Sequence, residues 1–149
     1  MLIHTMQTIE LMKTHVVTTT PDETLGNALD LMDLYQVESM PVIDSAGQLC
    51  GMLTEQDILD LLLCDIELNQ EDAAVRGELI ARASRANRRV EEAMRPSALS
   101  IPQTAECMEA ALVLLRSGFR RLPVTDSEGK VVGTFNRVDV CQALFEGVL

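Results

Sequence analysis

The sequence predicts a mixed α/β chain of the α+β type, made of two copies of one β-α-β-β-α unit. Its 149 residues, 47% apolar and 23% charged, have the ordinary composition of a compact globular protein. An internal repeat is evident when the chain is shifted by 82 residues, the distance from Pro41 to Pro123. Between Pro41 and Asp57, seven of seventeen positions are then identical, and Asp57 falls on Asp139. Hydrophobic periods and turn residues follow the same order in both copies.

The first copy begins with an extended segment at 16–19. A helix follows, because apolar residues recur there at helical spacing, namely at Leu25, Ala28, Leu29 and Met32. Two short strands come next, joined by the Asp, Ser and Gly turn residues of 44–47. A final helix is predicted to begin near Thr54.

The second copy repeats this order, with an extended segment at 98–101, a turn at 126–129 and a final helix near Asn136. Its first helix is predicted from the apolar positions Cys107, Ala110, Ala111 and Leu114. One copy alone would have too small a core, so the two copies are expected to pack together. We place the first repeat at 7–63, a connecting insert at 64–89 and the second repeat at 90–149.

The connection between the copies is rich in Ala, Glu and Arg, with one Gly and no Pro in 64–93, which favours a helix over a flexible linker. Arg82, Arg85, Arg88 and Arg89 share roughly one face of it. A solvated helix face is the favoured interpretation. The alternative is that these arginines reach a bound anion or an acidic partner surface.

The charge pattern argues against nucleic acid as a partner. Residues 1–75 hold fourteen acids and one base (1 − 14 = −13), and residues 76–149 hold eleven bases and nine acids (11 − 9 = +2), for a net −11. Neither a membrane span nor a signal pattern is present, so the sequence predicts a cytoplasmic protein. Four widely spaced cysteines and two histidines make a zinc site improbable and indicate reduced core thiols.

Candidate chemistry lies at the strand-to-helix junction Gly51-Met52-Leu53-Thr54-Glu55-Gln56-Asp57. A Thr hydroxyl at a helix start lies beside unpaired N–H groups and the positive end of the helix dipole, which favours phosphate. An Asp one turn later can accept two hydrogen bonds from a ribose diol. The same pair could instead cap the helix, with Thr54 as N-cap and Asp57 reaching back to its N–H. Taken alone, the motif slightly favours capping.

Both copies combine an xPVxDxxG turn with a following strand-to-helix junction of the pattern G-h-x-[ST]-x-x-D, in register and over nearly the whole chain. This pattern resembles a tandem pair of cystathionine-β-synthase (CBS) domains, also called a Bateman module. The resemblance implies two repeats packed by their sheets about a pseudo-twofold axis. It also implies two clefts that bind adenosyl ligands such as AMP, ADP, ATP or S-adenosylmethionine, with no chemistry done on the ligand.

The resemblance assigns one cleft to residues of both copies: Met52, Thr54, Asp57, Ala98, Leu99, Arg120, Pro123 and Arg137. Aliphatic side chains would sandwich the adenine, Asp57 would hold the ribose hydroxyls, and Thr54 with Arg120 would meet the phosphate. Arg137 could add a charge-assisted hydrogen bond.

The second cleft departs from the pattern, because Asn136 replaces the expected Ser or Thr and Glu38 stands where the first cleft has Arg120. Asn is as good an N-cap as Thr, so capping is expected to survive there. A carboxylate facing a phosphate at ~4 Å costs a few kcal/mol at an effective dielectric near 20. We therefore expect one competent cleft, or a second that takes an uncharged adenosyl moiety at most.

These observations predict a regulatory module that senses an adenosyl ligand and signals by conformational change to an unknown effector protein. No residues remain for an effector domain, and family members commonly form homodimers through helices, here 105–117 and the C-terminal helix. The alternative keeps the fold without a ligand, as a dimeric scaffold. An enzyme is not expected, because the sequence has no Walker-type loop, metal cluster or paired nucleophile and base.

Overall fold

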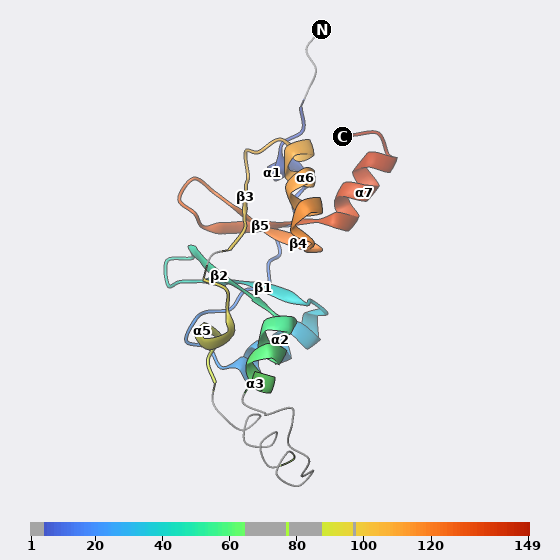
Figure 1. The fold of residues 1–149 in the computed structure, drawn as a ribbon. Helices are drawn as coiled ribbons and strands as arrows, with labels where there is room; N and C mark the ends of the chain where they lie inside the picture. Colours follow the sequence, from blue (N-terminus) through green and yellow to red (C-terminus); the bar gives the residue numbers. More distant parts are fainter. Residues whose placement is uncertain (1–4, 65–76, 78–87, 97) are drawn as a thin grey trace. The chain divides into compact units, whose positions relative to one another are not determined.

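The computed structural model describes residues 5–64, 77, 88–96 and 98–149 (Figure 1). The chain divides into two compact units. Unit 1 comprises Met1–Val16, Ser45–Leu49 and Ala98–Leu149. Unit 2 comprises Val17–Asp44 and Cys50–Ser97.

Unit 2 carries the elements of the first repeat and one short helix from the start of the second. They are α2 (Leu25–Tyr35), β1 (Ser39–Ile43), β2 (Leu49–Thr54, its first residue grouped with unit 1), α3 (Glu55–Cys64) and α5 (Val90–Ala93). Helix α2 begins at the N-cap Thr24, whose hydroxyl accepts a hydrogen bond from the Asn27 N–H at 3.2 Å. It ends at Gln36, which adopts a left-handed conformation with φ of 53°.

The core of unit 2 lies between the two-stranded sheet and its helices. Helices α2 and α3 both lie on one side of β1 and β2 (Figure 1), so their apolar faces meet the same face of the sheet. The buried residues of this core are Leu25, Ala28, Met32, Val37, Met40, Val42, Leu53, Ile58 and Val90. Val90 belongs to the second repeat in sequence, yet it is buried in the same core as residues of the first repeat.

Unit 1 has the same order of elements, with a third strand. They are α1 (Thr8–Leu11), β3 (Ile101–Pro102), α6 (Cys107–Ser117), β4 (Arg121–Thr125), β5 (Val131–Asn136) and α7 (Arg137–Phe145). Strand β3 is parallel to β4, and β4 is antiparallel to β5. The core residues are Ile101, Cys107, Ala110, Leu114, Leu122, Val124, Phe135 and Val140.

The predicted β-α-β-β-α order is confirmed in the second repeat, and its α-β-β-α part is confirmed in the first. The extended segment at 98–101 leads into strand β3, whereas the segment at 16–19 makes only a single parallel bridge, from Thr19 to Val42. Both predicted hairpin turns are present, with Gly47 and Gly129 at φ of 81° and 80°. Most of the predicted helical insert lies outside the described residues.

The compact units do not coincide with the sequence repeats, because each unit takes its leading segment from the other repeat. Helix α1 lies at the start of the first repeat but packs in unit 1, where Thr8 N donates to the Ala105 carbonyl at 2.8 Å. Helix α5 lies at the start of the second repeat but packs in unit 2, where Val90 N donates to the Glu23 carbonyl at 2.9 Å. Residues 8 and 90 are 82 apart, so this exchange is symmetric.

Within the described part of the chain, no helix has the length and apolar character that crossing a membrane requires.

Candidate ligand-binding site

The junction of β2 and α3 places Thr54 at the start of the helix. Thr54 is 7% exposed, and its hydroxyl oxygen accepts a hydrogen bond from the Asp57 N–H at 3.0 Å. This is the bond of an N-capping residue, so the predicted capping role of Thr54 is confirmed. The bond also fixes the first turn of α3, from which the Asp57 side chain extends.

The carboxylate of Asp57 does not complete the capping box that the motif suggested. Its Oδ2 atom accepts a hydrogen bond from Arg95 Nε at 2.9 Å, instead of reaching back to the Thr54 N–H. The Thr54 N–H belongs to strand β2, which continues to this residue. The Asp57 side chain is 16% exposed and that of Arg95 is 51% exposed. The Asp57 carboxylate thus forms an ion pair at the edge of the helix.

A short antiparallel bridge brings Arg95 to this position. Met52 N donates to the Arg95 carbonyl at 3.0 Å, and Arg95 N donates to the Met52 carbonyl at 2.8 Å. A Cβ added to Gly51 would lie 2.7 Å from the Arg95 carbonyl oxygen and 3.0 Å from Met94 Sδ. Only glycine permits this close approach of the two backbones. Met52 itself is buried, at 3% exposed.

The second repeat has the same arrangement around Asp139, with a different cation. Lys13 pairs with Thr134 through two backbone hydrogen bonds of 2.8 and 2.9 Å, and its Nζ lies 3.6 Å from Asp139 Oδ1. Gly133 permits the approach, because a Cβ there would lie 2.6 Å from the Lys13 carbonyl oxygen. The equivalence of Lys13 and Arg95 was not part of the sequence prediction, although both follow a Met and lie 82 residues apart.

The expected cap at Asn136 is wrong. Asn136 occupies the N-cap position of α7 with extended backbone angles, but its side chain accepts no capping hydrogen bond. Its Oδ1 atom is buried and has no hydrogen-bond partner among the residues that the structure describes. Asn136 is also the last residue of strand β5. The two junctions therefore differ at the residue that replaces Thr54.

The site residues predicted in the second repeat lie in unit 1. Arg120 and Arg137 are both exposed, and the Arg137 N–H donates to the Arg120 carbonyl at 2.8 Å, which brings the two residues together at the start of α7. Ala98 is half-buried, Leu99 is 45% exposed and Pro123 is buried. That these residues join Met52, Thr54 and Asp57 in one site stays a prediction.

The same backbone bond in unit 2 confirms that Glu38 and Arg120 hold equivalent places. There the Glu55 N–H donates to the Glu38 carbonyl at 3.0 Å. The start of α3 is consequently flanked by Glu38, whereas the start of α7 is flanked by Arg120.

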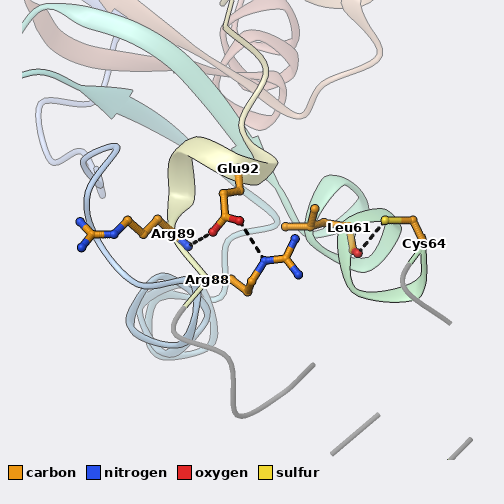
Figure 2. A network of polar contacts seen from close by, with 5 residues as sticks. All are labelled: Leu61, Cys64, Arg88, Arg89 and Glu92. Carbon is orange, nitrogen blue, oxygen red and sulfur yellow. Dashed lines mark hydrogen bonds and ion pairs between the residues drawn. The ribbon is translucent and has the colours of Figure 1, made fainter. Parts of the chain in front are cut away.

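The arginines before α5 make contacts within unit 2. Figure 2 shows Arg88 Nε donating to the Glu92 carboxylate at 3.0 Å and the Arg89 N–H donating to the same carboxylate at 2.7 Å. The Arg89 N–H, with the positive charges of Arg88 and Arg89, holds the pKa of Glu92 below its ordinary value. Arg82 and Arg85 of the predicted arginine face lie outside the described residues.

The cysteines are only partly the core thiols expected. Cys107 is buried, and burial raises its pKa. Cys64 and Cys141 are exposed, and Cys50 is intermediate. Among the described residues, no group of three or more His, Cys, Asp or Glu side chains could hold a metal ion.

The chain belongs to the CBS-domain family, because the model of the CBS domain matches residues 9–64 and 90–146. It is 30% identical over 144 residues to the chloroplastic CBS domain-containing protein CBSX2 of Arabidopsis thaliana and 28% identical to CBSX1 of the same plant. Each alignment covers 89% of this chain and 59% of the relative, so the chain spans about three fifths of these relatives.

Solved structures of CBS-pair proteins are similar to this chain. The crystal structure of CBSX2 is similar with a TM-score of 0.76 and 28% identity, covering 96% of each chain. A structure of CBSX2 in complex with AMP has a TM-score of 0.73 and 28% identity, covering 96% of this chain and 98% of the other. The CBS pair of the protein MJ0100 with 5-methylthioadenosine and S-adenosyl-L-methionine has a TM-score of 0.68 at 18% identity, a likeness of fold.

Proposed function

We propose that the chain is a regulatory CBS-pair module that binds an adenosyl ligand, AMP, ADP, ATP or S-adenosylmethionine, without transforming it. One observation carries the proposal: Asp57 stands one turn into α3, on the helix start that Thr54 caps. A carboxylate held there can accept both hydroxyls of a ribose, and the helix N-terminus favours an anion. CBSX2, which is similar along most of this chain, has been solved with AMP.

In this proposal the remaining predicted residues have two roles, set by whether their side chains are charged or apolar. Arg120 and Arg137 are exposed cations at the start of α7 and would meet the phosphate. The apolar side chains that would enclose the adenine are Met52, Ala98, Leu99 and Pro123. The absence of a capping bond from Asn136 supports a single competent site per chain.

Signalling would pass to a partner through a change in the arrangement of the repeats, and the chain would pair as a homodimer through α6 and α7. Support for pairing comes from the exposed apolar side chains of these two helices, which include Leu115 at 72% and Phe145 at 93%. Light scattering of the purified protein tests this proposal, and a monomer at micromolar concentration would contradict it. A cytoplasmic location stays a prediction.

A ligand-free scaffold is the second candidate, favoured by the capping bond of Thr54, which gives that residue a structural role without any ligand. A thermal-shift panel of AMP, ADP, ATP and S-adenosylmethionine separates the two. A ligand at 100 times its dissociation constant adds about 2.7 kcal/mol to stability, which raises the melting temperature by roughly 5–10 °C for a chain of this size. A rise with one of the four supports the sensor, and no rise with any of them supports the scaffold.

A further inference from the structure

The charges around the start of α3 are mostly negative. Glu38 lies beside it through the Glu55 backbone bond, and Glu55, Asp57 and Asp60 are on the helix itself. Such a junction repels a phosphate, because like charges several ångströms apart are destabilising even at a high effective dielectric. An anionic nucleotide that places its ribose on Asp57 therefore needs a compensating cation nearby.

Arg95 is the cation that unit 2 supplies. Among the described residues of this unit, the positive side chains are Arg88, Arg89 and Arg95, and Arg88 and Arg89 lie before α5 around Glu92. Arg95 alone of these three is bonded to the junction, through Asp57 Oδ2 at 2.9 Å. Its backbone is held in place by the two Met52 hydrogen bonds and by the absence of a side chain at Gly51.

This ion pair contributes little to the fold. The Arg95 side chain is about half exposed, and exposed pairs contribute only small amounts to stability. The contact leaves Asp57 able to accept further hydrogen bonds, since a carboxylate offers about four lone-pair sites. The Arg95 guanidinium thus neutralises the charge of the Asp57 carboxylate, while the carboxylate can still accept hydrogen bonds from the ribose hydroxyls.

We propose that Arg95 is a specificity-determining residue of the adenosyl site, which makes the acidic junction of α3 accept anionic nucleotides in preference to uncharged nucleosides. The inference rests on the proposed function. It assigns to the segment that leads into the second repeat a part in the ligand site of the first.

The test is the ratio of two dissociation constants, those of AMP and adenosine, measured by calorimetry on the full chain. Arg95→Met keeps the length and apolar stem of the side chain and removes the charge. We expect Arg95→Met to weaken the binding of AMP about tenfold relative to the binding of adenosine, as loss of one nearby charge implies. Arg95→Lys is expected to restore most of the preference for AMP.

Lys13→Met is the matched control, because Lys13 holds the equivalent place beside Asp139, and it should leave the ratio at its wild-type value. A ratio that stays unchanged in Arg95→Met, or that changes equally in Lys13→Met, would overturn the inference. If the wild-type chain remains folded by circular dichroism but binds neither adenosine nor any of AMP, ADP, ATP and S-adenosylmethionine, the proposed function itself fails. The two failures are therefore distinguishable.

Discussion

Gly51→Ala tests the close packing that holds the leading segment of the second repeat on unit 2. The added Cβ would lie 2.7 Å from the Arg95 carbonyl oxygen, whereas ordinary van der Waals contact begins near 3.4 Å. The backbone would have to separate by several tenths of an ångström, which strains the two Met52 hydrogen bonds of 2.8 and 3.0 Å. Overpacking of this kind costs about 1–3 kcal/mol. A loss of ~2 kcal/mol lowers the melting temperature by roughly 4–8 °C in a chain of this size.

Gly26→Ala is the matched control, because a Cβ there meets nothing within 4 Å and the residue lies in helix α2. Alanine in a helix is favoured over glycine, so this variant should gain about 0.5–1 kcal/mol. Urea denaturation followed by circular dichroism measures both variants. If Gly51→Ala were as stable as Gly26→Ala, the close approach of the two segments would not exist as described.

Two further predictions concern stability. Thr54→Val removes a capping hydrogen bond and should cost about 1 kcal/mol, whereas Asn136→Val removes an oxygen that bonds nothing and should be neutral or stabilising; equal losses in urea denaturation would show that the two caps are alike. The pKa of Glu92 is lowered in the fold from its ordinary value of 4.5, so its contribution is complete above that pH and is lost as the pH falls through the lowered pKa. Glu92→Gln should therefore have a flatter stability curve on the acid side of pH 4.5, and an unchanged acid limb would count against the Arg89 N–H contact.

The repeat, its elements and the junction could be predicted from the sequence because they depend on local signals. Helical periodicity predicted α2 and α6, whose buried residues match the apolar positions closely, with Leu29 as an exception at 38% exposed. The turn at 126–129 follows from Asp126, whose carboxylate accepts from the N–H groups of Glu128 and Lys130. The Thr54 cap follows from residue type at a helix start.

The ion pairs could not be predicted in this way, because the partners of Asp57 and Asp139 come from distant parts of the chain. Nothing local shows which sheet a short leading segment will join. A signal was nevertheless present: the same 82-residue shift that aligns Gly51 with Gly133 also aligns the two basic residues that follow Met12 and Met94. Applied to the leading segments, the repeat would have indicated a cation beside each aspartate.

The cap at Asn136 failed for a different reason. Residue type fixes the capacity of a side chain to cap, but the rotamer depends on its surroundings, and here the amide oxygen is buried without a partner. Sequence preference for Asn at an N-cap is an average over many helices. Thr54 and Asn136 are both common N-cap residues, but in the structure only the Thr54 side chain accepts a capping hydrogen bond.

We propose one adenosyl site per chain, centred on Asp57. Calorimetric titration of AMP into the wild-type chain, Asp57→Ala and Asp139→Ala measures it directly, because each variant breaks one of two equivalent ion pairs. We predict one AMP per chain for the wild type and for Asp139→Ala, and loss of binding in Asp57→Ala. Two equal sites in the wild type, or undiminished binding by Asp57→Ala, would contradict the claim.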